Sequence, residues 1–209
     1  MMVKSMKPAK AEVQIIAGKL RRRRIQCLVQ DTLRPTPMRV REAYFSIMGN
    51  AIPDRHFFDV FAGTGIHGLE AVSRGATEAT FIEHDRHLVD SLNDNMRLLK
   101  IDQQGLVLKA DVYRWVERWM APQEAVNVFV SPPFPDLTNK KEEFIKLIAE
   151  LMEKVAIDST VTVQAEDNFD ITELPGEEWD IRTYGRNVLA IWVKPDPNAP
   201  PDDVVEEEE

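Results

Sequence analysis

Several features that would point to other classes of protein are scarce in this sequence. Cys27 is the only cysteine in 209 residues, so no disulfide can form within the chain, and a reducing cytoplasm is the expected location. No run of 18 or more apolar residues is present, which argues against a membrane span. The start, MMVKSMKPAKAEV, is basic but has no apolar stretch, so it does not resemble a secretory signal. His84 and His87 lie close together, but no Cys/His cluster completes a metal site, and no metal is expected.

Charge is distributed unevenly along the chain. The net charge is −9, yet residues 1–41 hold eleven of the 26 Lys and Arg residues and only two of the 35 acidic residues. This basic segment includes the run Arg21, Arg22, Arg23 and Arg24. Such a segment can bind nucleic-acid phosphates although the whole protein is acidic. A solvated charged terminus is the alternative, and charge alone leaves both interpretations open.

The hydrophobic pattern predicts an α/β fold. A hairpin over residues 13–29, turning near Gly18, is followed by a helix over 37–49. Strands and helices then alternate, which indicates a doubly wound, mostly parallel sheet, and a hairpin over 179–194 adds antiparallel strands. The expected strands are 56–62, 79–85, 105–111, 125–131 (before a proline-broken loop) and 160–166, and the expected helices are 68–75, 86–101, 112–120 and 140–155.

Three segments are expected along the chain. Residues 1–35 form a basic N-terminal β-hairpin extension, of which residues 1–11 are loosely ordered. Residues 36–195 form the main domain. Residues 196–209 are rich in proline and then in acid, which is typical of a disordered tail.

The stretch FAGTGIHG places Gly63, Gly65 and Gly68 between a predicted strand and a predicted helix. This spacing is typical of a loop that lets a nucleotide cofactor approach the backbone. Glu83 follows Gly63 by 20 residues, at the end of the next strand, where a carboxylate can bind ribose hydroxyls. Nicotinamide or flavin dinucleotides and S-adenosylmethionine all remain compatible with these residues.

Asp59, four residues before Gly63, favours one of these cofactors. A pyrophosphate prefers positive potential, whereas S-adenosylmethionine has no phosphate and carries a sulfonium and an ammonium group. An acid beside the loop therefore favours S-adenosylmethionine. Asp111, at the end of the third strand, can accept a hydrogen bond from an adenine amino group or can cap a helix.

A second motif, Ser131-Pro132-Pro133-Phe134, follows the fourth strand, at the sheet edge where ligands bind in such folds. Ser131 and the carbonyls before the prolines can hold both hydrogens of an exocyclic amine, and Phe134 can stack on an extruded base. The alternative is a proline-rich turn with Phe134 in the core. His67 is expected at the surface, and Trp115 and Trp119 are expected to serve packing.

With these motifs, the chain resembles the bacterial 16S ribosomal RNA guanine-N2 methyltransferases. The resemblance covers residues 14–193 and rests on IIAGKLRRRR, LRPTPMRVREAYF, DVFAGTGIHGLEAVSRGA, FIEHD, Asp111 and SPPF. It implies a class I methyltransferase (Rossmann-like) fold with a seven-stranded sheet and S-adenosyl-L-methionine as cofactor. The implied cofactor-binding residues are Asp59, Ala62, Gly63, Gly65, Glu83 and Asp111. The implied catalytic residues are Ser131, Pro132, Pro133 and Phe134, and the implied RNA contacts are Arg21, Arg22, Arg23, Arg24, Arg39 and Arg41.

The resemblance also implies the partner, which is 16S ribosomal RNA within the small ribosomal subunit or an assembly intermediate, and a monomeric enzyme.

One residue departs from the family, which usually has aspartate where this chain has Ser131. Serine carries no charge to stabilise the amine as it becomes positive. A DNA or other RNA amino-methyltransferase (adenine N6 or cytosine N4) and a non-catalytic RNA-binding assembly factor therefore stay open as alternatives.

Overall fold

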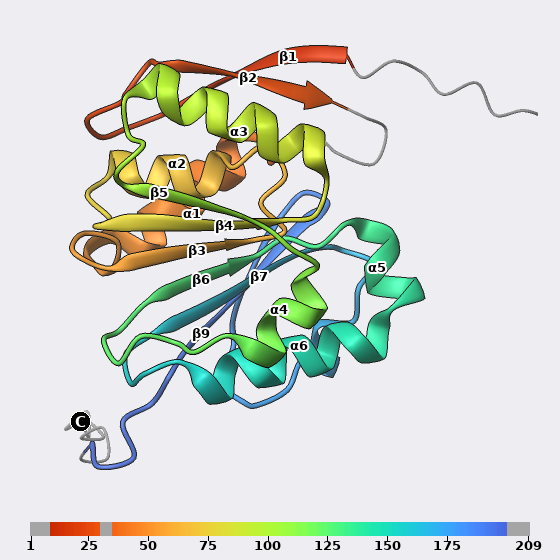
Figure 1. The fold of residues 1–209 in the computed structure, drawn as a ribbon. Coiled ribbons are helices and arrows are strands. Elements are labelled where there is room, and N and C mark those ends of the chain that lie inside the picture. The colour runs from red at the N-terminus through yellow and green to blue at the C-terminus, as the bar shows by residue number, and fades with distance from the viewer. Residues whose placement is uncertain (1–8, 30–34, 200–209) are drawn as a thin grey trace, which may run out of the picture.

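Seven strands form the central sheet of the computed structural model, which describes residues 9–29 and 35–199. Their order is β5-β4-β3-β6-β7-β9-β8. β3 to β7 are parallel, whereas β9 runs antiparallel to both β7 and β8 (Figure 1). The strands are β3 (His56–Val60), β4 (Glu78–Glu83), β5 (Gly105–Lys109), β6 (Asn127–Val130), β7 (Thr160–Glu166), β8 (Asp180–Tyr184) and β9 (Asn187–Val193).

Helices cover both faces of this sheet (Figure 1). α1, α2 and α3 pack on one face and α4 and α6 on the other, which gives two hydrophobic cores separated by the sheet. The helices are α1 (Met38–Met48), α2 (Ile66–Ser73), α3 (Arg86–Leu99), α4 (Val112–Arg118), α5 (Phe134–Asn139) and α6 (Lys141–Lys154), with short 3-10 turns η1 (Gly49–Ala51) and η2 (Ile171–Glu173).

The sequence of α3 shows why a helix forms there. The side chain of Asp85 accepts hydrogen bonds from the backbone N–H groups of His87 and Leu88, at 2.8 and 3.1 Å, and so caps the first turn. Apolar residues then recur at helical spacing and face the core. The helix ends at Lys100, whose φ of 60° lies in the left-handed region.

The N-terminal hairpin shares the core of the main sheet. Its strands, β1 (Ala9–Gln14) and β2 (Arg24–Val29), pair antiparallel above α2 and α3 (Figure 1). Ile15 and Ile25 are fully buried within the core that also holds residues of α2 and α3. Asn95 of α3 fixes the strand position, because its side chain bonds both the N–H and the carbonyl of Gln26, at 3.0 and 2.7 Å.

The predicted order of elements is confirmed, with two local differences. Residues 9–11 belong to β1, so the expected loose order of residues 1–11 is wrong for that part, and residues 1–8 lie outside the described residues. Helix α5 replaces the expected proline-broken loop after β6. It forms because its proline occupies the first turn, where a missing N–H costs nothing.

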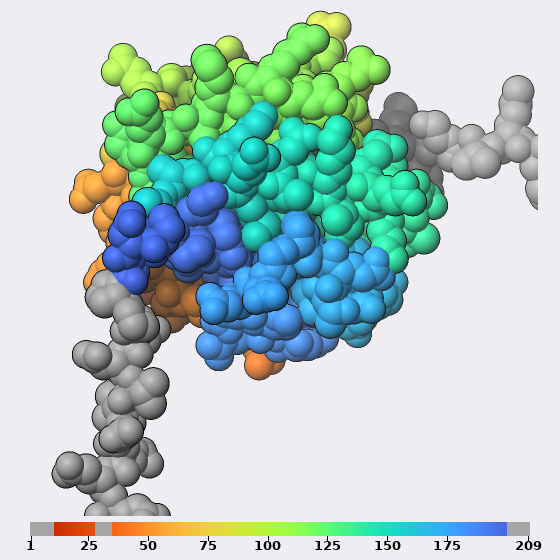
Figure 2. Space-filling model, turned by 90° about the horizontal axis from the view of Figure 1, so that it is seen from below, coloured from red at the N-terminus to blue at the C-terminus, as the bar shows by residue number. Residues whose placement is uncertain are grey.

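Seen from below, the segment after β7 lies beside α6, and the chain leaves β9 at the edge of this face (Figure 2). Residues 200–209, most of the expected disordered tail, lie outside the described residues. Among the helices that the structure describes, none has the length and hydropathy needed to cross a membrane.

Candidate active site

A single cavity brings the two predicted motifs together at the carboxyl ends of β3, β4, β6 and β7. The glycine loop forms one wall and the loop after β6 forms another. This is the position expected for a ligand in an open α/β sheet. The lining residues are Pro35, Thr36, Asp59, Phe61, Ala62, Gly63, Thr64, Ile66, His67, Glu83, His84, Asp85, Leu88, Ser131, Pro132, Pro133, Phe134 and Gln164.

The three glycines of the loop serve different purposes. Gly63, with φ of 54°, lines the cavity. A Cβ on Gly65 would lie 2.4 Å from Leu92 Cδ1, and one on Gly68 would lie 2.3 Å from Phe81 Cε1. The second and third glycines are therefore needed for close packing of α2, and the first is needed where the backbone faces the cavity.

Glu83 binds the backbone of the glycine loop and retains one acceptor site for a ligand. Its Oε2 accepts the Gly63 N–H at 2.8 Å, and its Oε1 accepts the N–H groups of His84 and Asp85, each at 2.8 Å. A carboxylate has about four acceptor sites, so one on Oε2 remains. A ribose hydroxyl is a suitable donor for that site.

Asp59 lies beneath the loop and is buried. Its Oδ2 accepts the Gly68 N–H at 3.0 Å, and burial raises the pKa of its carboxyl to about 7. With Glu83 and Asp85 it gives the cavity three carboxyl groups, whereas no Lys or Arg is present among the described residues that line it. This charge pattern fits a ligand with a sulfonium and an ammonium group and does not fit a pyrophosphate.

The SPPF loop is anchored at its start and open at its end. The Ser131 N–H donates to the Val60 carbonyl at 3.2 Å, which extends the pairing of β6 with β3. Ser131 is half-buried, Pro132 is buried and Phe134 is 42% exposed at the cavity. Gln164 follows the paired residues of β6 and β7 directly, so it lies beside Ser131 across the strands.

Some of the predicted site residues lie outside the cavity lining. Asp111 is exposed and caps α4, since its Oδ1 accepts the Arg114 N–H at 3.1 Å. Arg39 is exposed on α1. The exposed residues Arg21 to Arg23 belong to the hairpin turn, and the exposed Arg24 begins β2. That turn packs on the last residue of α2, where Lys19 N–H donates to Ser73 O at 2.7 Å. The cavity is lined instead by Ile66 and His67, at the opposite end of α2.

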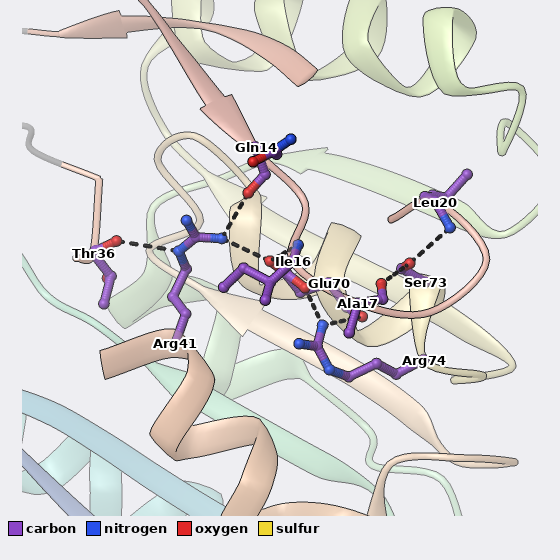
Figure 3. Close-up of polar contacts among 9 residues, drawn as sticks. All are labelled: Gln14, Ile16, Ala17, Leu20, Thr36, Arg41, Glu70, Ser73 and Arg74. Atoms are coloured by element: carbon purple, nitrogen blue, oxygen red, sulfur yellow. Dashed lines mark hydrogen bonds and ion pairs between the residues drawn. The ribbon is translucent and has the colours of Figure 1, made fainter. Parts of the chain in front are cut away.

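Arg41, predicted as an RNA contact, lies inside the protein (Figure 3). Its Nη1 lies 2.7 Å from Glu70 Oε1, and its Nε donates to Thr36 O at 3.2 Å. Glu70 also accepts the N–H of Ile16 at 2.9 Å and pairs with Arg74. This network joins the hairpin, α1, α2 and the cavity residue Thr36 (Figure 3).

Sequence reasoning missed several cavity residues. Thr36 Oγ1 donates to Gln164 Oε1 at 2.9 Å, a contact between residues 128 positions apart that no local pattern indicates. The expectation that His67 lies at the surface is wrong, because it is 4% exposed and stacks on Phe129 with ring centroids 3.9 Å apart. Burial, with the nearby charge of Arg41, lowers the pKa of His67 to about 3.

Comparisons with known proteins identify the family of this chain. The model of the family described as Conserved hypothetical protein 95 matches residues 13–193. The chain belongs to this family. It is 36% identical over 143 residues to ribosomal RNA small subunit methyltransferase D of Haemophilus influenzae, covering 68% of this chain and 73% of that protein.

Solved structures support the same fold. A candidate methyltransferase of Escherichia coli, yhhF, has a TM-score of 0.72 and 29% identity and covers 88% of this chain and 99% of its own. An RNA methyltransferase of Salinibacter ruber, solved with S-adenosyl-L-homocysteine, has a TM-score of 0.59 and 17% identity, covers 83% of this chain and all (100%) of its own, and supports the fold alone. The predicted class I methyltransferase fold is confirmed, and so is the expectation of a methyltransferase family with S-adenosylmethionine as its cofactor.

Proposed function

We propose that this protein transfers a methyl group from S-adenosylmethionine to the N2 amine of a guanine in 16S ribosomal RNA. The observation that carries the proposal is the shared cavity, in which an acidic cofactor loop faces the SPPF loop. The name of the Haemophilus influenzae relative supports small-subunit ribosomal RNA as the substrate. A small subunit or an assembly intermediate is the proposed partner, and the enzyme acts as a monomer in the cytoplasm.

Separate groups of residues are proposed to bind the methyl donor and the target base. Glu83 binds the ribose hydroxyls. Asp59 lies near the methionine part of the donor and supplies negative charge there, because a bound cation favours the ionised form of its carboxyl. When bound, the donor supplies the methyl group through its sulfonium. Ala62 and Gly63, which line the cavity, bring the backbone close to it, and Gly65, which lies outside the lining, stays a proposed contact. Asp111, which caps α4 through Oδ1, stays a proposed adenine contact, because a carboxylate that accepts one N–H keeps further acceptor sites.

The base is held by the loop after β6. Ser131 Oγ and the carbonyls before Pro132 and Pro133 accept hydrogen bonds from the amine, which turns its lone pair toward the donor. Phe134, half-exposed beside the cavity, stacks on the extruded base. The reaction then depends mainly on position and orientation, as expected for an in-line transfer.

The RNA must extend well beyond the cavity. α2 has eight residues and so spans about 12 Å, and the turn with Arg21 to Arg23, followed by Arg24 of β2, lies at its far end. A folded RNA that contacts both the turn and the cavity satisfies this geometry. Arg39, exposed on α1, is a proposed phosphate contact nearer the cavity. Arg41 can contact RNA only if its buried pair with Glu70 opens.

The test is transfer of labelled methyl from S-adenosylmethionine to small ribosomal subunits, naked 16S RNA and duplex DNA. Phe134→Ala serves as the site variant, and Ile181→Ala on β8, exposed to a similar extent (46% against 42%), serves as the control. We expect label in RNA as N2-methylguanine, lost with Phe134→Ala and kept with Ile181→Ala.

Other results would replace the proposal. Label in adenine N6 or cytosine N4 would keep the reaction and change the substrate. Donor binding without transfer to any of the three nucleic acids would favour the assembly-factor alternative. Protection of 16S RNA by the protein without consumption of donor would support that alternative directly.

A further inference from the structure

Tyr113 of α4 lies between the two loops that form the cavity, although it does not line the cavity itself. Its ring packs edge-on against the ring of Phe61, with centroids 5.6 Å apart. Phe61 lines the cavity immediately before Ala62 and Gly63. Its φ of 62° lies in the left-handed region, which is uncommon for a bulky residue, so this backbone depends on its surroundings.

The hydroxyl of Tyr113 reaches the other loop. It donates to Asp136 Oδ2 at 3.0 Å. Asp136 lies two residues after Phe134, in the first turn of α5, and its backbone N–H donates to the Pro133 carbonyl at 2.8 Å. Lys140 Nζ, 3.2 Å from the same Oδ2, is the second partner of this carboxylate. Asp136 therefore fixes the end of the SPPF loop.

The loop needs such an anchor because prolines weaken its backbone attachment. Pro132 and Pro133 have no N–H, so they can donate no hydrogen bond to the sheet. Ser131 is held at the start through its N–H and Val60 O. At the other end the side chain of Asp136 is what ties the loop to α4. Tyr113 thereby connects this end of the loop to Phe61 at the cofactor loop.

We propose that Tyr113 is a positioning residue for methyl transfer, which sets the SPPF loop against the glycine loop through Asp136. The inference rests on the function proposed above. The residue touches neither donor nor base, so its loss changes the distance and angle between amine and methyl and leaves the cofactor contacts intact. Displacements of about 1 Å at a reacting centre can reduce rates about 100-fold.

Tyr113→Phe is the decisive variant, because it removes the hydroxyl and keeps the ring against Phe61. We expect kcat to fall about 10-fold or more, since a hydrogen bond to a charged group is lost. The dissociation constant of S-adenosyl-L-homocysteine, measured by calorimetry, should stay within about twofold, because Asp59 and Glu83 are untouched. Tyr184→Phe on β8, outside the cavity lining, removes a tyrosine hydroxyl elsewhere and should change neither quantity.

Two further measurements separate positioning from simple stability. Hydrogen exchange of the α5 amides should accelerate in Tyr113→Phe, whereas that of α2 should not. Asp136→Ala should lower kcat at least as much as Tyr113→Phe, and the double variant should be no slower than Asp136→Ala, because the hydroxyl acts through that carboxylate.

The outcomes distinguish the two proposals. If the unaltered protein transfers methyl and Tyr113→Phe has the same kcat, the positioning role is wrong, whatever happens to its melting temperature. It is equally wrong if the losses in the double variant simply add. Absence of transfer by the unaltered protein, with faster α5 exchange in Tyr113→Phe, would remove the proposed function but keep the anchor.

Discussion

Arg41 Nη1 lies 2.7 Å from Glu70 Oε1, and the two side chains are 4% and 0% exposed. Two charges in such a position are costly to remove from water, and the structure compensates with further hydrogen bonds. Arg41 donates to backbone carbonyls of Gln14 and Thr36, both at 3.2 Å, while Glu70 accepts from Ile16 N–H. The pair thereby joins the hairpin to α1 and to the cavity wall (Figure 3).

Loss of one partner should be severe. Arg41→Met leaves Glu70 buried with one cation, Arg74, and removes two bonds to backbone carbonyls. We expect the free energy of unfolding to fall by about 3–5 kcal/mol, measured by urea denaturation. Arg39→Met, two residues earlier on the same helix but exposed, should stay within about 0.5 kcal/mol. A similar decrease in the free energy of unfolding for both variants would show that the buried pair contributes no more to stability than an exposed arginine does.

The buried position of Arg41 is a feature that the sequence alone did not predict. The spacing of hydrophobic residues predicted the order of strands and helices. The position of two loops at the carboxyl ends of strands predicted the cavity, so the main site could be predicted from the sequence. Nothing local distinguishes Arg41 from Arg39 in RVRE, and only helix orientation against Glu70 makes one buried and the other exposed. Contacts between segments distant in the sequence therefore determine which of the two arginines is buried.

His67 and the hairpin turn illustrate the same limit. A histidine within a glycine loop carries no pattern that reveals its stacking on Phe129. The run Arg21 to Arg24 indicated phosphate binding, but its distance from the cavity depends on Ser73 of α2, which accepts the turn's N–H groups. In both cases the place of the residues in the fold depends on contacts between distant segments, and phosphate binding by the arginine run stays a prediction.

Asp59 and His67 should give stability opposite dependences on pH. The pKa of Asp59 rises from 3.8 to about 7 on folding, so the folded state binds the extra proton between these values and stability falls as pH rises. The pKa of His67 falls from 6.5 to about 3, so between these values the unfolded state binds the extra proton and stability rises with pH. In the unaltered protein the two effects offset each other between about pH 4 and 6.5.

Single variants should separate these effects. Relative to the unaltered protein, Asp59→Asn should gain stability as pH rises from 5 to 6.5, and His67→Gln should lose it, each by at most about 1.4 kcal/mol per pH unit. Urea denaturation at pH 5, 6, 7 and 8 gives both curves; that of His67→Gln should flatten above about pH 7, and that of Asp59→Asn only as the pH approaches about 8. If the stability difference from the unaltered protein changed with pH in the same direction in both variants, the pKa shifts assigned to Asp59 and His67 would be wrong.

The hairpin turn should contribute to RNA affinity through charge alone. Arg21 and Arg22 are exposed at the turn, so Arg21→Gln with Arg22→Gln should weaken binding of 16S RNA without changing stability. If both contact phosphates, the slope of log affinity against log salt should decrease by about 1.5. Arg182→Gln with Arg186→Gln, on the C-terminal hairpin, is the matched control. Equal effects from both pairs would indicate nonspecific attraction.

Ser131 gives the sharpest test of the chemistry. It lines the cavity beside Gln164 and stands where the resemblance leads us to expect aspartate. A carboxylate there would stabilise the amine as it becomes positive, so Ser131→Asp should raise kcat, by about 10-fold or more, if serine limits the present rate. Ser131→Ala, which removes the acceptor, should lower kcat by about 10-fold or more. Single-turnover transfer of labelled methyl to RNA measures both. Equal rates for serine, alanine and aspartate would mean that the amine is held by backbone carbonyls alone, and that the side chain at this position has no part in the reaction.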